Sequence, residues 1–285
     1  YLLVLLLLLL IYFLINNFIK ENYLNNNKVL TFKKPKNWKN MTFSNKLTIY
    51  GDNLTIEYSF YADKLKVKDY IINLNINDLH IPKTIKVLNK DDNLNLNELP
   101  SNCVIKSNCG SGDIIIIKNK KIKMMKARNI KVNNYINWKK KATKPHITKH
   151  EKHYKHIKPE IFVEQYLGDN IYDYKFFCFH GIVKFFSIDS DRFINVCRNF
   201  YDKNFNLLKF TKGNNNCSKK LKKPKNLEKM INIAEKLSKI FEFTRVDLYE
   251  IDDKIYFGEL TFLPAAGNNN IKPEKYNKLI GSYWK

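Results

Sequence analysis

The sequence predicts an α+β fold, on the evidence of two strand pairs and one amphipathic helix. Segments 172–189 and 245–262 each consist of two β-rich runs joined by a short polar turn. Between them, 226–241 repeats apolar residues at spacings of three and four, the period of a helix with one buried face. Hairpins mixed with packing helices are typical of the α+β class. The 285 residues, 44% of them apolar, suffice for one large or two modest globular domains.

An uncharged, largely apolar run opens the sequence and extends over residues 1–19. It is about as long as a membrane-spanning helix needs, roughly 17 to 25 residues, and no small-residue cleavage site follows it. We therefore expect a transmembrane or signal-anchor helix, with a cleaved signal peptide as the alternative. The nearest downstream charges are mostly lysines, which predicts a single-pass membrane protein whose remaining part is cytosolic. Residues 20–40 are polar and predict a linker.

The remaining elements follow in order along the chain. Apolar residues at helical spacing predict a helix over 59–71. Segment 97–119 has the pattern of a strand, a glycine loop and a second strand, and 121–141 is interpreted as helical. Residues 160–168 predict a further strand. Asn226 is suited to cap the amphipathic helix described above.

The strong positive charge is spread along the whole chain. The formal net charge is +23, but the lysines accompany many Asn and Ile residues in every segment. Dispersed lysines form no focused patch, so we do not expect nucleic acid as a partner. Two denser runs, at 138–144 and 219–225, are interpreted as solvated basic faces, with binding of an acidic substrate or lipid headgroups as the alternative.

The cysteines predict free thiols. They form no CxxC pair and are odd in number, so reduced thiols in a cytosolic setting are the simplest interpretation. The five residues are Cys103, Cys109, Cys178, Cys197 and Cys217.

The C-terminal hairpin carries polar residues where a core hairpin would have apolar ones. Residues two apart share a strand face, so Arg245 faces the same way as Asp247, and Glu259 the same way as Thr261. A two-residue turn at 252–253 would put the carboxylates on opposite faces, whereas a three-residue turn or one bulge would place Asp247 opposite Glu259. Facing carboxylates repel unless a cation lies between them, which indicates a Mg²⁺ site. The alternative is ordinary charge on a solvated strand pair.

Two further segments have the residue types of a nucleotide site. Lys106 ends a strand, and the serines and glycines of 107–112 leave backbone N–H groups free to meet a polyphosphate. An ordinary glycine turn is the alternative. Glu164 ends another apolar strand, where it could accept a hydrogen bond from an adenine amine or a ribose hydroxyl; a solvated glutamate is the alternative.

Four histidines lie close together in a lysine-rich segment. They are His146, His150, His153 and His156. On a helix they would line one face and could hold Zn²⁺, but the lysines between them would repel a cation. We interpret the segment as a basic surface helix or loop.

Taken in order, several segments resemble the ATP-grasp superfamily, and within it the branch similar to the teichuronopeptide biosynthesis protein (TupA-like ATP-grasp). The resemblance covers roughly 32–284. It is carried by "ADKLKVKDYI", "LPSNCVIKSNCGSG", "EIFVEQYL", "DYKFFCFHG", "KPKNLEKMINIAEKL" and "RVDLYEIDDKIYFGELTFLPAAG". The last segment is the most specific of them.

The resemblance implies an ATP-grasp domain over 41–285, in which two α+β lobes enclose a nucleotide and Mg²⁺ bridges its phosphates. It divides that domain into an N-terminal part at 41–96, an ATP-binding small lobe at 97–163 and a large lobe with the metal site at 164–285.

The resemblance also implies roles for individual residues. The phosphates are contacted by Lys64, Lys106, Ser107, Gly110, Ser111 and Gly112. The adenine hinge comprises Glu164, Gln165, Tyr166 and Leu167, with Asp173 and Lys175 nearby. The catalytic residues are Arg245, on the transferred phosphoryl group, and Lys106. The metal ligands are Asp247, Glu259 and Thr261, although the superfamily usually has Asn at the last position, and Cys109 stands where this branch is expected to have His.

The implied activity is ATP- and Mg²⁺-dependent ligation of a carboxylate to an amine through an acyl phosphate. The branch implies work on cell-surface polysaccharide, with an amino acid or peptide joined to a uronic acid. One alternative is a glycosyltransferase of polysaccharide biosynthesis. Another is a basic protein that binds nucleic acid or lipid headgroups and has a degenerate ATP site.

Overall fold

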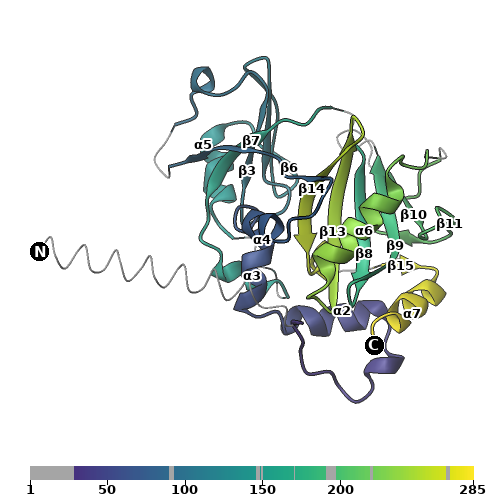
Figure 1. Ribbon diagram of the computed structural model, residues 1–285. Helices are drawn as coiled ribbons and strands as arrows, with labels where there is room; N and C mark the ends of the chain where they lie inside the picture. The colour runs from purple at the N-terminus through teal and green to yellow at the C-terminus, as the bar shows by residue number, and fades with distance from the viewer. Residues whose placement is uncertain are drawn as a thin grey trace, which may run out of the picture.

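Two β-sheets of unequal size form the framework of the protein (Figure 1). The computed structural model describes residues 29–89, 93–145, 148, 150–169, 171–190, 197–218, 221–267 and 270–285. The predicted anchor at 1–19 lies outside these residues, as does the first part of the predicted linker. Among the residues described, none of the helices combines the length and the apolar character that crossing a membrane requires.

The smaller sheet has six antiparallel strands in the order β2-β7-β3-β4-β5-β6. Their bounds are β2 (Thr84–Leu88), β3 (Cys103–Ser107), β4 (Ile114–Lys118), β5 (Lys121–Ala127), β6 (Ile130–Lys131) and β7 (Ile161–Gln165). Helix α5 (Tyr135–Ala142) covers one face and inserts the fully buried Trp138 into a separate small core. Because β2 pairs with β7, the small lobe begins before residue 97, where the sequence placed its boundary.

The helix expected over 121–141 is wrong for its first part. Strand β5 pairs with the isoleucine-rich β4 and extends the sheet. Met125 and Ala127 are buried on one face, whereas Met124 and Lys126 on the other face are half-buried. Lysine and methionine are good helix formers, so the pairing with β4 has overridden the local propensity of this segment.

Three short helices precede the sheets and pack on the core of the large lobe. They are α2 (Phe43–Asp52), α3 (Ile56–Ala62) and α4 (Val67–Asn73). The single helix predicted over 59–71 is therefore interrupted. Asp63 causes the interruption, because its Oδ1 accepts hydrogen bonds from the N–H groups of Leu65 and Lys66 at 2.8 and 3.3 Å and so competes with the helical pattern.

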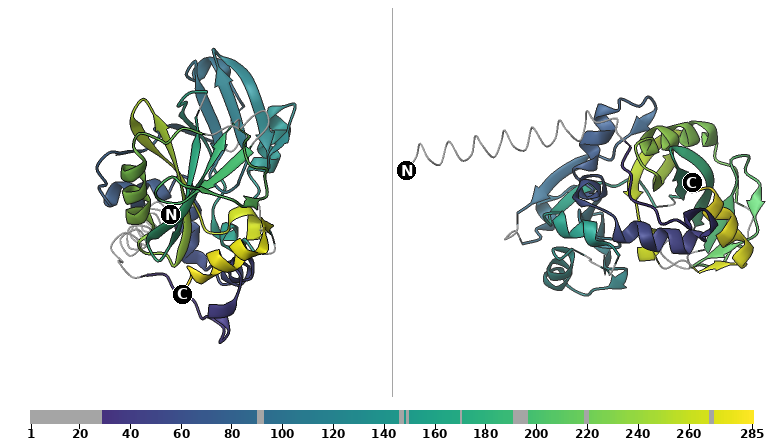
Figure 2. Two further views of the ribbon diagram at one scale, coloured as in Figure 1. Left: turned by 90° about the vertical axis from the view of Figure 1, so that its right-hand side faces the viewer. Right: turned by 90° about the horizontal axis from the view of Figure 1, so that it is seen from below.

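The larger sheet has seven strands in the order β1-β14-β13-β8-β9-β10-β11. Their bounds are β1 (Leu79–His80), β8 (Asp173–Phe179), β9 (Ile182–Ser190), β10 (Cys197–Tyr201), β11 (Leu207–Leu208), β13 (Phe243–Ile251) and β14 (Lys254–Thr261). Only β1 runs parallel to its neighbour. Figure 2 shows the smaller sheet, in blue and teal, to one side of the larger sheet, in green and yellow. The predicted strand pairs at 172–189 and 245–262 are both confirmed.

Two helices and a two-stranded ribbon complete the large lobe. Their bounds are α6 (Leu227–Ser238), α7 (Glu274–Ser282), β12 (Thr211–Lys212) and β15 (Ile271–Lys272). Short 3-10 turns occur at Trp38–Asn40, Leu96–Glu98, Lys152–His156 and Pro264–Gly267. The amphipathic helix is confirmed as α6, but the capping role of Asn226 is wrong. Its side-chain amide instead donates to Glu250 Oε1 at 2.9 Å and to the Asp253 carbonyl at 3.1 Å, which ties the helix start to the end of the β13–β14 hairpin.

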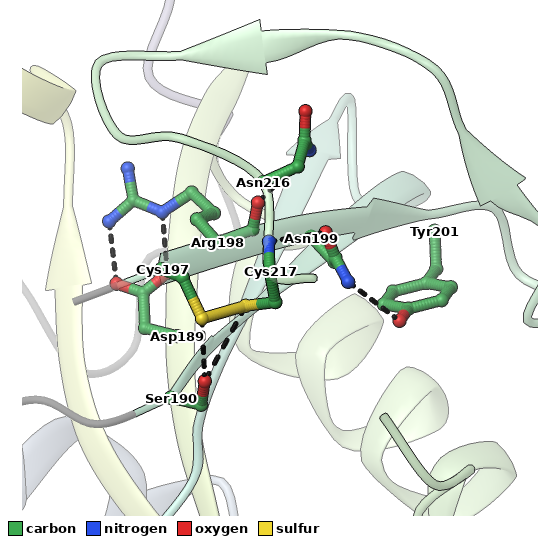
Figure 3. Close-up of a disulfide and its surroundings, with 8 residues drawn as sticks. All are labelled: Asp189, Ser190, Cys197, Arg198, Asn199, Tyr201, Asn216 and Cys217. Atoms are coloured by element: carbon green, nitrogen blue, oxygen red, sulfur yellow. Dashed lines mark hydrogen bonds and ion pairs between the residues drawn. A yellow bond between two sulfur atoms is a disulfide. The ribbon is translucent and has the colours of Figure 1, made fainter. Parts of the chain in front are cut away.

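One disulfide contradicts the expectation that all five cysteines are reduced. Cys197 on β10 is bonded to Cys217 in the loop after β12, with their Cα atoms 4.9 Å apart (Figure 3). The two residues are 20 positions apart and belong to no spacing motif, so only the fold brings them together. The other three are free and buried.

Candidate active site between the two lobes

The β13–β14 hairpin combines features of both registers considered from the sequence. Its turn has two residues, Asp252 and Asp253, both with positive φ, as in the turns that suit tight hairpins. A bulge then follows, because Gly258 is the extra residue on β14 between the pairs Leu248–Phe257 and Asp247–Glu259. A Cβ on Gly258 would lie 2.8 Å from the Asp247 carbonyl oxygen, so the close approach requires glycine.

This bulge places the two predicted metal-binding carboxylates opposite each other. Arg245 Nη2 lies between them, 2.7 Å from Asp247 Oδ2 and 3.1 Å from Glu259 Oε1. The Thr261 hydroxyl lies 3.0 Å from the same nitrogen. Three oxygen atoms therefore converge on one cationic centre.

A buried chain of charges continues from this point across the sheet. Lys175 on β8 donates to Asp247 at 2.7 Å and to Asp173 at 2.5 Å. Burial raises the pKa of Asp247, although Arg245 and Lys175 act in the opposite direction. Burial would also raise the pKa of Glu259, but the positive charges of Lys64 and Arg245 outweigh it and lower this pKa to about 2.

The smaller sheet contributes a second charged cluster. The Glu164 carboxylate is buried and accepts from Lys106 and, at 2.9 Å, from Lys68. Burial alone would raise the pKa of Glu164, but the two ammonium groups lower it. The Glu164 carboxylate, which we expected to accept a hydrogen bond from adenine or ribose, is thus bound to two lysines. In this structure it positions Lys106.

The glycine loop lies between the two charged clusters. Lys64 reaches across and donates to the Gly110 carbonyl at 2.6 Å, and it also approaches Glu259 at 3.7 Å. Gly112 has a φ of 77°, and a Cβ there would lie 2.3 Å from Asn129. Ser107 differs from the expectation for this loop, because its hydroxyl is buried and donates to the Ala142 carbonyl at 2.6 Å.

These residues enclose a cavity of about 410 Å³ between the lobes. Predicted residues that line it are Lys64, Lys106, Gly110, Ser111, Gly112, Glu164, Asp173, Lys175, Arg245, Asp247 and Glu259. A smaller and more apolar slot of about 100 Å³ adjoins it, and Lys106, Glu164, Ile114 and Tyr249 line both. Gln165, Tyr166 and Leu167 line the slot, whereas neither Ser107 nor Cys109 lines either space.

Six charged residues of the cavity were not predicted from the sequence. They are Lys68, Asp113, Lys126, Asp189, Arg198 and Lys212. Asp189 faces Arg198 on the next strand, and its two carboxylate oxygens accept from that guanidinium (Figure 3). In a chain so rich in lysine, nothing in the local sequence distinguishes these residues from solvated charges. A cross-strand pairing prediction for 189 and 198 was the one signal that could have found this pair.

The histidine segment forms no metal site in the described part of the chain, which excludes His146. His153 is buried, so the expectation of a basic surface segment is wrong for this residue, and burial lowers its pKa to about 3. His150 pairs with Asp52 at 2.8 Å. The segment therefore has a structural role beside α3.

The hairpin oxygens fit a divalent ion better than the histidines do. No group of three or more His, Cys, Asp or Glu side chains suited to a metal occurs among the described residues, so any site must use other donors as well. Asp247 and Glu259 supply two carboxylates and Thr261 adds a hydroxyl around the position of Arg245 Nη2, and a metal ion bound there would take the place of that nitrogen. Hard oxygen donors completed by phosphates and water are the ligands that Mg²⁺ takes. Asp247, Glu259 and Thr261 are therefore the residues that would hold it.

Two lobes that face each other across a charged cavity and an apolar slot define the ATP-grasp class of fold. The chain belongs to the TupA-like ATP-grasp family, which matches residues 42–285. The resemblance inferred from the sequence motifs is thereby confirmed. No curated protein sequence matches the chain.

Similar solved structures include three ligases. The D-alanine-D-alanine ligase from Helicobacter pylori is 16% identical, with 80% of this chain and 61% of that chain covered and a TM-score of 0.43. The D-alanine-D-alanine ligase from Bacillus anthracis complexed with ATP is 18% identical, with 79% and 63% covered and a TM-score of 0.40. The L-amino acid ligase from Bacillus licheniformis is 11% identical, with 75% and 43% covered and a TM-score of 0.39. The chain thus spans less than two thirds of the length of each.

Proposed function

We propose that this protein is an ATP- and Mg²⁺-dependent ligase that joins a carboxylate to an amine. The observation that carries the proposal is the convergence of the Asp247–Glu259 pair, Arg245 and the lysines of the small lobe on one cavity. Membership of the TupA-like ATP-grasp family supports the same activity.

The slot and the cavity have the character of the two ends of a nucleotide. The slot is bounded by Val104, Ile116, Leu167 and Tyr249, which suits a flat apolar base. Lys106 lies where the slot meets the cavity, so its ammonium is placed for the phosphates. The backbone of 110–112 lines the cavity beside it and offers N–H groups to the same phosphates.

The reaction proceeds in two transfers. An oxygen of the acceptor carboxylate attacks the γ-phosphorus of ATP, the bond from that phosphorus to the β–γ bridging oxygen breaks, and ADP leaves with an acyl phosphate formed. The amine nitrogen then attacks the acyl carbon, the bond to the phosphate oxygen breaks, and an amide, inorganic phosphate and one proton result. Phosphoryl transfer depends mainly on position and on neutralised charge, which Lys106 and Arg245 supply from opposite lobes. A Mg²⁺ ion held by Asp247 and Glu259 would neutralise further phosphate charge.

The biological setting is part of the same proposal. The family is linked to cell-surface polysaccharide, so we propose a uronic acid as the acceptor and an amino acid or peptide as the amine. The apolar run at 1–19 would anchor the enzyme at a membrane, close to lipid-linked glycans.

The decisive experiment measures ADP release with Mg²⁺ and ATP across pairs of uronic acids and amino acids. We expect release that requires both substrates, and a fall of at least about 100-fold in Asp247→Asn, because the carboxylate is lost at nearly constant shape. Lys209→Met, which removes an exposed charge, is the matched control and should keep full activity. Turnover that persists in Asp247→Asn, or sugar-nucleotide turnover without ATP, would reject the proposal.

A further inference from the structure

The basic end of the cavity, Arg198 and Lys212, has no role in the nucleotide arrangement described above. Arg198 lies on β10 and Lys212 on β12, and both line the cavity together with Arg245. Asp189 holds the Arg198 guanidinium through both carboxylate oxygens. Among the described residues, Lys212 has no carboxylate partner.

A lysine that is largely buried without a carboxylate partner is unusual in proteins. Only 4% of Lys212 is exposed, and lysines are almost never buried to that degree unless they are paired. Burial, with the neighbouring guanidinium groups of Arg198 and Arg245, lowers the pKa of Lys212 to about 7, and Asp189 opposes this shift without cancelling it. An anion beside Lys212 would stabilise the charged ammonium and so offset the cost of burying it.

The position of this basic end separates it from the nucleotide slot. Arg198, whose Nη1 contacts the Lys212 carbonyl, lies on β10, three strands from β13 in the larger sheet, which is about 14 Å at the usual spacing between strands. The apolar slot lies on the other side, where the small lobe supplies Val104, Ile116 and Leu167. A group bound at Lys212 would therefore lie away from the base of the nucleotide.

The chain holds the basic end in place through several covalent and polar links. The disulfide joins β10 directly to the loop that follows Lys212 (Figure 3). The Arg198 N–H donates to the Asn215 carbonyl at 3.0 Å, and the Arg198 carbonyl accepts from Asn216 at 3.1 Å. Arg198 Nη1 donates to the Lys212 carbonyl at 3.3 Å. The Arg198 side chain and the backbone of Lys212 are therefore held in place before any ligand arrives, which favours tight binding.

We propose that Lys212, with Arg198 beside it, binds a carboxylate group of the acceptor substrate. The inference deepens the proposed ligase function and rests on it. Lys212 forms a charge-assisted hydrogen bond to the carboxylate, and Arg198 supports it electrostatically while remaining paired with Asp189. The acceptor is thereby held on the large lobe, beyond Arg245, while the nucleotide occupies the slot and the cavity beside the small lobe.

The test compares ligand binding by wild type and by three variants in calorimetric titrations. Lys212→Met removes the charge, Lys212→Arg keeps it, and Lys209→Met removes an exposed charge nearby as the matched control. The probes are D-glucuronate and D-galacturonate, with D-glucose and D-galactose as the counterparts without the carboxylate. Each is titrated with and without a non-hydrolysable ATP analogue and Mg²⁺, and the affinity for the analogue is measured separately.

We expect wild type to bind at least one carboxylate probe about tenfold or more tightly than its uncharged counterpart. Lys212→Met should lose this preference, while its affinity for the ATP analogue changes by less than about twofold. Lys212→Arg should keep part of the preference, and Lys209→Met all of it.

Several results would overturn the inference. They are a carboxylate preference that survives in Lys212→Met, the absence of any preference in wild type, and a loss of affinity for the ATP analogue in Lys212→Met as large as the loss for the carboxylate. The last result would assign Lys212 to the nucleotide phosphates. A wild-type protein that binds no ATP analogue would instead reject the proposed function, and the titrations without nucleotide would still decide whether Lys212 binds carboxylates.

Discussion

Replacement of Lys212 by Met should stabilise the protein in a way that depends on pH. The pKa of Lys212 falls from 10.5 to about 7 on folding, because burial and two neighbouring guanidinium groups disfavour the charged form. Between these two values the unfolded chain binds a proton that the folded chain does not. The free energy of unfolding of wild type therefore gains about 1.4 kcal/mol per pH unit from this group as the pH rises through the window.

The full difference between the two pKa values corresponds to about 4 to 5 kcal/mol. Below pH 7 the folded wild type bears this whole penalty, so Lys212→Met should be more stable by an amount of that order, since Met preserves the buried alkyl chain. Above pH 10 the two proteins should converge. Urea denaturation at intervals between pH 6 and 10, with the variant subtracted from wild type, isolates this group from other titrating residues. A difference that stays constant with pH would refute the reasoning.

Two further predictions concern other features of the large lobe. Gly258→Ala places a Cβ 2.8 Å from the Asp247 carbonyl oxygen, so the bulge that aligns Asp247 with Glu259 must shift. We expect this variant to be less stable by about 1 to 3 kcal/mol and to release less ADP. An unchanged denaturation midpoint together with unchanged turnover would contradict this prediction. Thiol titration of the unfolded, unreduced protein should detect three thiols, and five reactive thiols would show that the Cys197–Cys217 bond is absent. Replacing both Cys197 and Cys217 by Ser should lower the free energy of unfolding by about 3 kcal/mol, because the bond closes a loop of 20 residues.

The secondary structure could be predicted from the sequence wherever the local pattern of residues, and not a tertiary contact, determines the element. The apolar spacing of α6 gave its position, and the two strand pairs were recognised from their alternation and turns. The segment 121–127 was misjudged because its residues favour a helix in isolation, and only the exposed edge of β4 makes them a strand. The break at Asp63 was missed for a similar reason, since it depends on one side chain competing for backbone N–H groups.

Residues of the candidate site were likewise predicted where a local pattern placed them and missed where only the fold brings them to the cavity. Asp247 and Glu259 were found because a hairpin restricts which of its residues can face each other to two registers. Lys68 and Lys212 were missed because each reaches the cavity from an element distant in the sequence, and nothing local marks them among so many lysines. Glu164 was predicted to contact the nucleotide, and its contact with Lys68 was missed because the fold alone brings β7 close to the start of α4.

The charge of the cavity fits the small polyanion that the proposed function requires. Eight basic and six acidic residues line it, so the excess of positive charge is small compared with the +23 of the whole chain. Most of these charges are already paired with each other, as Lys175 is with Asp173 and Asp247. A nucleic-acid surface requires exposed cations that track a backbone, whereas this excess is enclosed in about 410 Å³, within the usual range for small-molecule sites. The charge inside the cavity therefore fits the small-molecule substrates proposed above.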